Sequence, residues 1–161
     1  MAILNIIKEG DPVLRKKCRP VEEITPRILQ LLDDMHETLE KAQGVGLAAP
    51  QVGVMRRIVI VEIEDKKYEM INPEIIETKG KQEEIEACLS VPEKFGLVKR
   101  PQWVKVRATD RNGKVYEVSG NGLMARCFCH ELDHLDGTLY IDKAKKMLYP
   151  DEDGYYEEDE D

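Results

Sequence analysis

The segment His130-Glu131-Leu132-Asp133-His134 constrains this chain more than any other part of its sequence. Residues four apart on a helix lie on one face, about 6 Å apart along the axis, so both imidazoles can hold one cation. Glu131 lies next to His130 around the axis, where its carboxylate can reach a water on that cation. This arrangement suits metal-assisted hydrolysis, in which the ion acidifies a water and the carboxylate transfers its proton.

A catalytic metal site of this kind needs a third protein ligand and an open fourth position. The position at which metzincin proteases carry their third ligand is Tyr140 here, a poor ligand, so we expect the ligand to lie upstream. Cys88 is the candidate, although a free cysteine is also a common small core residue. A closed structural site that also uses Cys127, one helical turn before His130, is the alternative, but it would leave Glu131 without a role.

The hydrophobic pattern predicts the α+β class, with antiparallel strands in the middle of the chain and helices on either side. The first helix is expected at 25–43, with Thr25 as N-cap and Gly44 as the stop. The second is expected from Gly122 to about Leu135 and ends at Gly137. Strands that form two hairpins are expected at 57–64, 68–72, 103–109 and 115–119.

The 161 residues are enough for one domain and too few for two ordinary ones, so we expect a single catalytic domain over 1–150. The last eleven residues, 151–161, contain eight carboxylates and predict a disordered acidic tail. The formal net charge of -8 belongs to this tail, because residues 1–150 contain 24 acidic and 24 basic groups. Net charge therefore says little about the partners of the domain.

We expect a cytoplasmic protein without a signal peptide or membrane span. Lys8 and Glu9 interrupt the first apolar stretch, and no run approaches the roughly 20 apolar residues that a span needs. In that reducing compartment the four cysteines, Cys18, Cys88, Cys127 and Cys129, are expected to be thiols or ligands rather than disulfides.

A second segment, Gly44-Val45-Gly46-Leu47-Ala48-Ala49-Pro50-Gln51, follows the first predicted helix. Its small residues permit close approach by another backbone or a ligand, but it lacks the Lys-Ser/Thr ending of a phosphate loop. This segment, Glu86-Ala87-Cys88-Leu89-Ser90 and 130–134 together resemble the three signature motifs of peptide deformylases, in the same order. The resemblance extends over residues 3 to 142. It implies antiparallel sheets packed around a central helix that carries the metal-binding motif.

The resemblance also implies roles for individual residues. Cys88, His130 and His134 would ligate the metal with water as the fourth ligand, and Glu131 would be the general base that later protonates the departing amine. The side-chain amide of Gln51 and the backbone N–H of Leu89 would stabilise the oxyanion.

The family removes the formyl group from the initiator methionine of nascent bacterial chains and releases formate. Gly46 would pair with the substrate peptide as an added strand, and Val45, Leu123 and Cys127 would form the methionine pocket. A Glu86–Arg100 ion pair would hold the cysteine loop. Two positions depart from the family pattern: Ala87 replaces a usual glycine, and Arg126 stands where relatives are often apolar.

One thiolate and two imidazoles suit several divalent metals. The resemblance implies Fe(2+) in the cell, with Zn(2+), Ni(2+) or Co(2+) as other possibilities. The expected partners are formylmethionyl nascent peptides and, transiently, the ribosome; no direct reading of nucleic acid and no membrane contact are expected. The alternative function is a zincin-type metallopeptidase that cuts internal peptide bonds.

Overall fold

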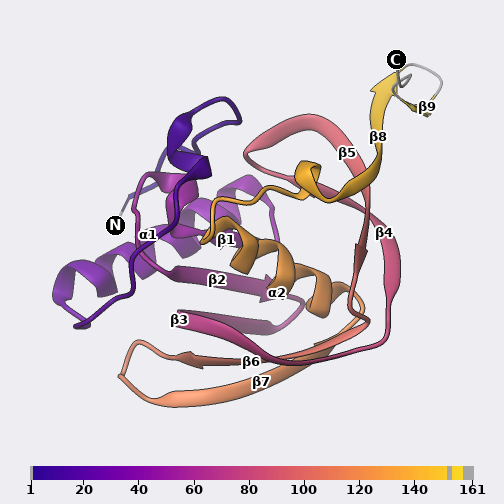
Figure 1. Ribbon diagram of the computed structural model, residues 1–161. Helices are drawn as coiled ribbons and strands as arrows, with labels where there is room; N and C mark the ends of the chain where they lie inside the picture. The colour runs from indigo at the N-terminus through magenta and orange to yellow at the C-terminus, as the bar shows by residue number, and fades with distance from the viewer. Residues whose placement is uncertain (1, 152–153, 158–161) are drawn as a thin grey trace.

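The computed structural model describes residues 2–151 and 154–157 (Figure 1). In this part of the chain, two helices, three short 3-10 turns and nine strands follow one another. The helices are α1 (Pro26–Ala42) and α2 (Leu123–His134), and the turns are η1 (Pro12–Arg15), η2 (Ala49–Val52) and η3 (Tyr140–Asp142). The strands are β1 (Gly46–Ala48), β2 (Ile58–Ile63), β3 (Lys66–Lys79), β4 (Gln82–Cys88), β5 (Val91–Arg100), β6 (Trp103–Thr109), β7 (Val115–Asn121), β8 (Ala144–Asp151) and β9 (Gly154–Glu157).

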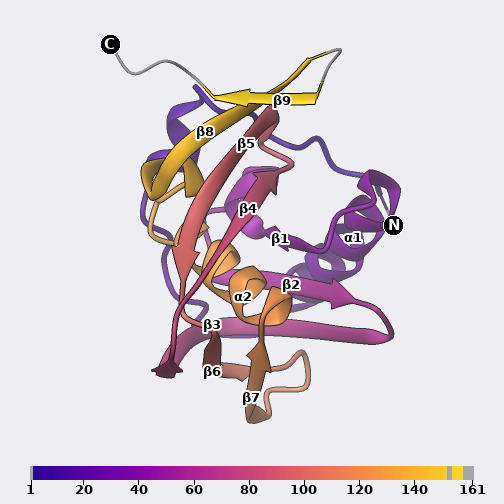
Figure 2. The same cartoon turned by 90° about the vertical axis from the view of Figure 1, so that its right-hand side faces the viewer.

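The strands form two antiparallel sheets. One has the order β1-β2-β3-β6-β7 and the other the order β4-β5-β8-β9, so β1 and β4 are edge strands. Helix α2 contacts every strand of the first sheet and also β5 of the second (Figures 1 and 2). The expected α+β class with antiparallel sheets around a central helix is confirmed.

The ends of α1 follow its local sequence. Thr25 accepts a hydrogen bond from the backbone N–H of Ile28 at 3.3 Å, and Pro26 occupies the first turn. The helix ends at Ala42, because Gln43 adopts a left-handed conformation with φ of 58° and donates its N–H to the last carbonyls. The predicted range of 25–43 is thus confirmed to within a residue at each end.

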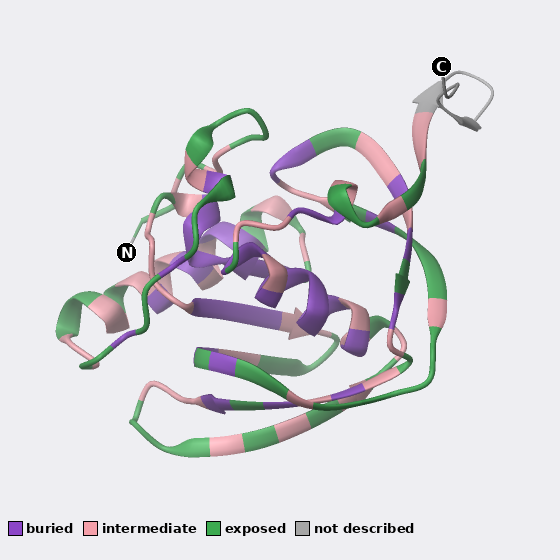
Figure 3. Ribbon diagram, viewed as in Figure 1, coloured by how far each residue is buried: buried purple, intermediate pink, exposed green. Residues whose placement is uncertain are grey.

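Helix α2 is largely buried (Figure 3). Eight of its twelve residues are buried, and Phe128 packs with Val59, Met70 and Val104 in the core between α2 and the first sheet. Charged groups on this helix are therefore held by neighbouring elements rather than by water. Any chemistry on α2 takes place inside the fold.

The prediction missed strands β1, β4, β5 and β8 and underestimated β3. In β4, three of the seven residues of Gln82–Cys88 are glutamates and hide the strand pattern, and β5 contains Pro92 and Gly96. Cys88 consequently lies at the end of a strand, not in a connection between strands. The register shifts between Glu86 and Cys88, so Ala87 occupies a bulge without a positive φ, a conformation open to alanine.

Part of the expected tail forms a strand. The backbone of β9 pairs with β8 in the register of Tyr149 with Tyr156, in a segment where tyrosines favour extended structure. Residues 152–153 and 158–161 of the expected tail lie outside the described residues. Within the described ranges, neither helix has the length and apolarity needed to cross a membrane.

Candidate metal centre and adjoining pocket

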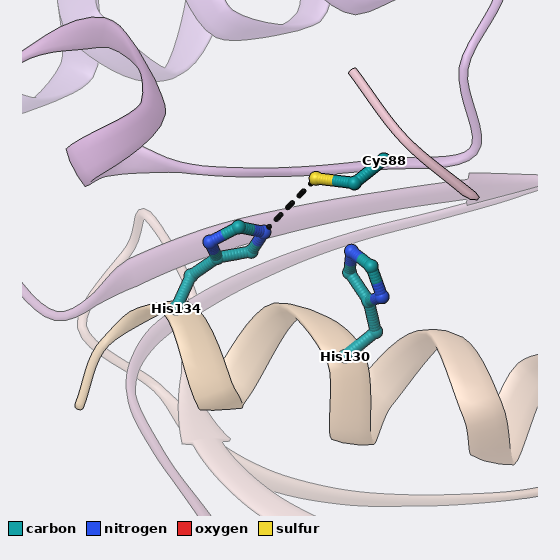
Figure 4. A group of neighbouring side chains, drawn as sticks. All are labelled: Cys88, His130 and His134. Atoms are coloured by element: carbon teal, nitrogen blue, oxygen red, sulfur yellow. Dashed lines mark hydrogen bonds between the residues drawn. The ribbon is translucent and has the colours of Figure 1, made fainter. Parts of the chain in front are cut away.

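Three side chains from two elements meet beside α2. His130 and His134 project from one face of the helix with ring centroids 5.2 Å apart, and Cys88 reaches them from the end of β4 (Figure 4). The Sγ of Cys88 lies 3.4 Å from Nε2 of His134, and one ligand atom from each residue lies within 4.8 Å of the others. An ion about 2.0–2.3 Å from each ligand spans roughly these separations. The predicted trio is therefore brought together in a geometry that fits one ion.

Among the described residues, this group contains Cys88 and not Cys127. The thiol of Cys127 instead lies 3.8 Å from the carbonyl oxygen of Val45, to which it donates. Burial raises the pKa of Cys127 well above its usual value, with Glu131 adding to the effect, so the group stays a neutral thiol. The closed four-ligand site considered in the sequence analysis therefore lacks one of its ligands, because Cys127 faces the carbonyl oxygen of Val45.

A buried ion pair holds His130. Its Nδ1 lies 2.9 Å from Oε1 of Glu86. Arg100 donates from Nε to Oε2 of the same carboxylate at 2.9 Å and from Nη2 to Oε1 at 3.0 Å. Arg100 also donates to Asp133 at 2.6 Å. Burial alone would raise the pKa of Glu86, but the bonds from His130 and Arg100 lower it to about 2. This fixed carboxylate sets the ring orientation and leaves Nε2 of His130 for a metal.

His134 and Glu131 are buried beside the same group. Burial lowers the pKa of His134 well below its usual range, which keeps the imidazole neutral and able to ligate. Burial raises the pKa of Glu131 to about 7, and its Oε1 has no hydrogen-bond partner among the described residues. A cation at the cluster would favour the ionised form of Glu131. The unpaired Oε1 of Glu131 lies next to the three candidate ligand atoms. From there it could accept a proton from a water bound to a metal in the site.

Gln51, in η2, is oriented by groups from β1 and from the turn after β4. Its Oε1 accepts the backbone N–H of Ala48 at 2.9 Å, which assigns Nε2 to the other side. There Nε2 donates to Oγ of Ser90 at 3.1 Å and lies 3.6 Å from Sγ of Cys88. Leu89 directly follows Cys88 in the turn between β4 and β5. An amide donor and this turn therefore border the ligand group.

A cavity of about 390 Å³ opens onto this group between the edge strands β1 and β4, with α2 beside it. Of the predicted substrate residues, Val45, Gly46, Leu123 and Cys127 all line it. The other residues around it include Gln51, Ile85, Glu86, Ala87, Cys88, Leu89, Arg126, His130 and Glu131. Val45, Ile85 and Leu123 are 42–46% exposed, so three exposed large apolar side chains lie around one cavity. The cavity therefore has an apolar rim and a polar end.

The sequence did not single out three contributors. Ile85 and Asp133 were missed because the β4 pattern was not recognised and because the bond from Arg100 to Asp133 crosses between elements. Tyr140, considered only as a poor ligand, stacks on His130 with centroids 5.8 Å apart and donates its hydroxyl to the carbonyl of Lys94. The expected Glu86–Arg100 pair is confirmed.

The chain is similar in sequence and in structure to proteins of one known family. A family model described as polypeptide deformylase matches residues 3–148. Peptide deformylases of Agathobacter rectalis and Caldanaerobacter subterraneus are 54% and 53% identical over 149 and 152 residues, covering 92% and 94% of the chain and 94% and 96% of the relatives. Crystal structures of peptide deformylases from Legionella pneumophila and Thermotoga maritima share TM-scores of 0.86, at 41% and 38% identity. Both cover 89% of this chain, and the match covers 86% and 98% of theirs.

Proposed function

The chain belongs to the polypeptide deformylase family. We propose how its residues remove the formyl group from nascent peptides. The enzyme is a metal-dependent hydrolase of protein biosynthesis, and the comparisons do not support the alternative of a metallopeptidase. The observation that carries the residue assignments is one cavity lined by Cys88, His130, Glu131 and Gln51, where His134 completes a group of three side chains that could hold a metal ion.

The donor set that we assign to the metal is Sγ of Cys88 and Nε2 of His130 and His134. These groups suit Fe(2+), which we propose for the cell, and also Zn(2+), Ni(2+) or Co(2+). When bound, the ion acidifies a water and polarises the formyl oxygen. A thiolate donates charge to the ion, which increases the dependence of the reaction on a separate base.

Glu131 is the base that we assign. Its carboxylate takes a proton from the attacking water as the water oxygen bonds to the formyl carbon. It then gives that proton to the amine nitrogen as the C–N bond breaks, and the formic acid that leaves loses its hydroxyl proton to become formate. Burial raises the pKa of Glu131 above its usual value, which suits a carboxyl group that first takes and then returns a proton. The Nε2 of Gln51 and the N–H of Leu89 would donate to the oxygen on which negative charge develops.

The substrate would bind as an extended strand along β1. Among the described strands, β1 pairs only with β2, so its other edge is open toward the cavity, and Gly46 lets a peptide come close. The methionine side chain would enter between Val45, Leu123 and Cys127, where the apolar rim matches its chemistry.

The substrate also suggests where the enzyme works. Nascent chains emerge from the ribosome, so we place the enzyme in the cytoplasm in transient association with ribosomes. We further propose that residues 1–150 form the catalytic domain, so that deleting 151–161 would leave both formate release and ribosome association unchanged. A loss of either after the deletion would contradict this boundary.

The experiment is an anaerobic assay of formate release from formyl-Met-Ala-Ser, with metal analysis of the same sample. For Glu131→Gln we expect a rate lower by about 100-fold or more with the metal retained, because general acid–base groups contribute about that factor. Glu77→Gln removes an exposed carboxylate that pairs with Lys79 and is the matched control. Full activity of the Glu131→Gln enzyme at full metal occupancy would refute the mechanism.

A further inference from the structure

Arg126 gives the cavity a charge that the assigned mechanism does not use. It lines the cavity from α2, four residues before His130 and so about one helical turn toward the N-terminus of the helix. Its side chain is partly buried, and its Nε is buried without a hydrogen-bond partner among the described residues. No ion pair of Arg126 occurs in the described part of the chain.

The two carboxylates that border the same cavity, Glu86 and Glu131, face groups other than Arg126. Glu86 is held by Arg100 and His130, and the Oε2 of Glu131 lies against Gly46 next to the ligand group. Leaving a guanidinium half-buried without a counter-charge is unfavourable, and the cost disappears when an anion binds. The cavity therefore presents a free cation beside an apolar rim, a combination that fits a ligand with both an apolar and an anionic side chain.

The proposed binding mode fixes which substrate side chain can reach this cation. Successive side chains of an extended strand point to opposite faces, and two residues span roughly 6.6 Å. With the methionine side chain directed toward α2, the second side chain points away and the third points to α2 again. The distance from the first to the third residue is close to the separation of about 6 Å along the helix axis between Arg126 and His130.

We propose that Arg126 binds the carboxylate of an acidic residue at the third position of the substrate, so that the enzyme favours chains beginning formyl-Met-Xaa-Asp or formyl-Met-Xaa-Glu. This inference rests on the proposed function, because it takes the substrate register from the assigned site. The stem of Arg126 would cover the methionine side chain while the guanidinium meets the third residue. A partly exposed pair of this kind predicts a preference of about 5- to 20-fold rather than absolute selection.

The test compares kcat/KM for peptide amides, which carry no terminal carboxylate. The substrates are formyl-Met-Ala-Glu, formyl-Met-Ala-Lys and formyl-Met-Glu-Ala amides. In the native enzyme we expect the third-position Glu peptide to exceed the Lys peptide by about 10-fold, and this ratio to fall with added salt because charges are screened. An acidic residue at the second position should give no such advantage.

Variants separate the specific contact from general electrostatics. Arg126→Gln should bring the Glu/Lys ratio close to 1, Arg126→Lys should keep it above 1, and Arg126→Glu should reverse it. Arg27→Gln removes an exposed charge of the same sign on α1, outside this cavity, and should keep the native ratio. The inference is overturned if Arg126→Gln keeps the native ratio, or if acid at the second position is favoured equally. A metal-loaded native enzyme that releases no formate from any peptide would instead refute the proposed function.

Discussion

Gly46 offers the sharpest test of the close packing between β1 and the proposed base. A Cβ atom at this position would lie 2.6 Å from Oε2 and 2.8 Å from Cγ of Glu131, and 2.9 Å from Sγ of Cys127. Gly46 has no positive φ, so alanine would meet no backbone strain here. The nearest atoms that the new Cβ would meet therefore belong to two side chains of α2.

The size of the effect follows from these distances. Ordinary contact begins at 3.4 Å, so the carboxylate has to retreat by 0.8 Å, the difference from 2.6 Å. Misplacing a catalytic group by about 1 Å costs about 100-fold in rate. Overpacking of a buried site costs about 1–3 kcal/mol of stability. We expect kcat of Gly46→Ala to fall about 30- to 100-fold, with metal retained because the three nearest atoms belong to Glu131 and Cys127 and not to the proposed ligands.

Gly44→Ala is the matched control in the same segment. Its Cβ would meet the ends of two flexible side chains, Leu39 at 2.9 Å and Leu89 at 3.0 Å, which can rotate away. Formate release, metal content and urea unfolding are measured for both variants. Equal losses of kcat in the two variants, or metal loss in Gly46→Ala, would show that displacement of Glu131 is not the cause.

Three further predictions concern the charged networks. Glu86→Gln should weaken metal affinity about 10- to 100-fold, measured by chelator competition, because His130 loses its charged partner; unchanged affinity would contradict the orienting role. Arg100→Met should lower the free energy of unfolding by about 3–5 kcal/mol, because it leaves Glu86 buried and unpaired, and a loss below about 1 kcal/mol in urea titrations would argue against this. Burial would raise the pKa of Glu69, but bonds from Arg111 and His36 lower it to about 2, so its stabilising contribution is present above pH 4.5 and lost as pH falls toward 2. Glu69→Gln should thus remove about 3 kcal/mol of pH-dependent stability across that window, and a parallel pH curve for variant and native enzyme would refute the linkage.

The local part of the site could be predicted from the sequence. The helix that carries His130 and His134 has a clear apolar period, and a helix places residues four apart on one face whatever surrounds it. The first helix and the hairpin of β6 and β7 were likewise set by local caps and turns. Here local preference and tertiary packing agree.

The non-local part could not be derived from pattern. Cys88 lies far from His130 in sequence, and residue chemistry alone left Cys127 as a competing ligand. Only the pairing of β4 with β5 carries Cys88 to α2, and the carboxylates of β4 conceal that strand. The roles of Gln51 and Leu89 and the Glu86–Arg100 pair came from the family resemblance. Interactions that join distant segments leave no period in the sequence.

The ion pair of Glu86 and Arg100 lies in the interior of this fold although removing two charges from water costs free energy. Both side chains are at most 5% exposed, and a buried ion pair is on average no more stabilising than well-packed apolar groups of the same size. Its advantage lies in direction, because a bidentate guanidinium fixes both carboxylate oxygens and one of them fixes Nδ1 of His130. Arg100 is also bonded to Asp133 on α2, so one residue of β5 ties the strand that carries Cys88 to the helix that carries both histidines. A site whose ligands come from separate elements needs such a connection, since packing alone would leave the distance between β4 and α2 free to vary.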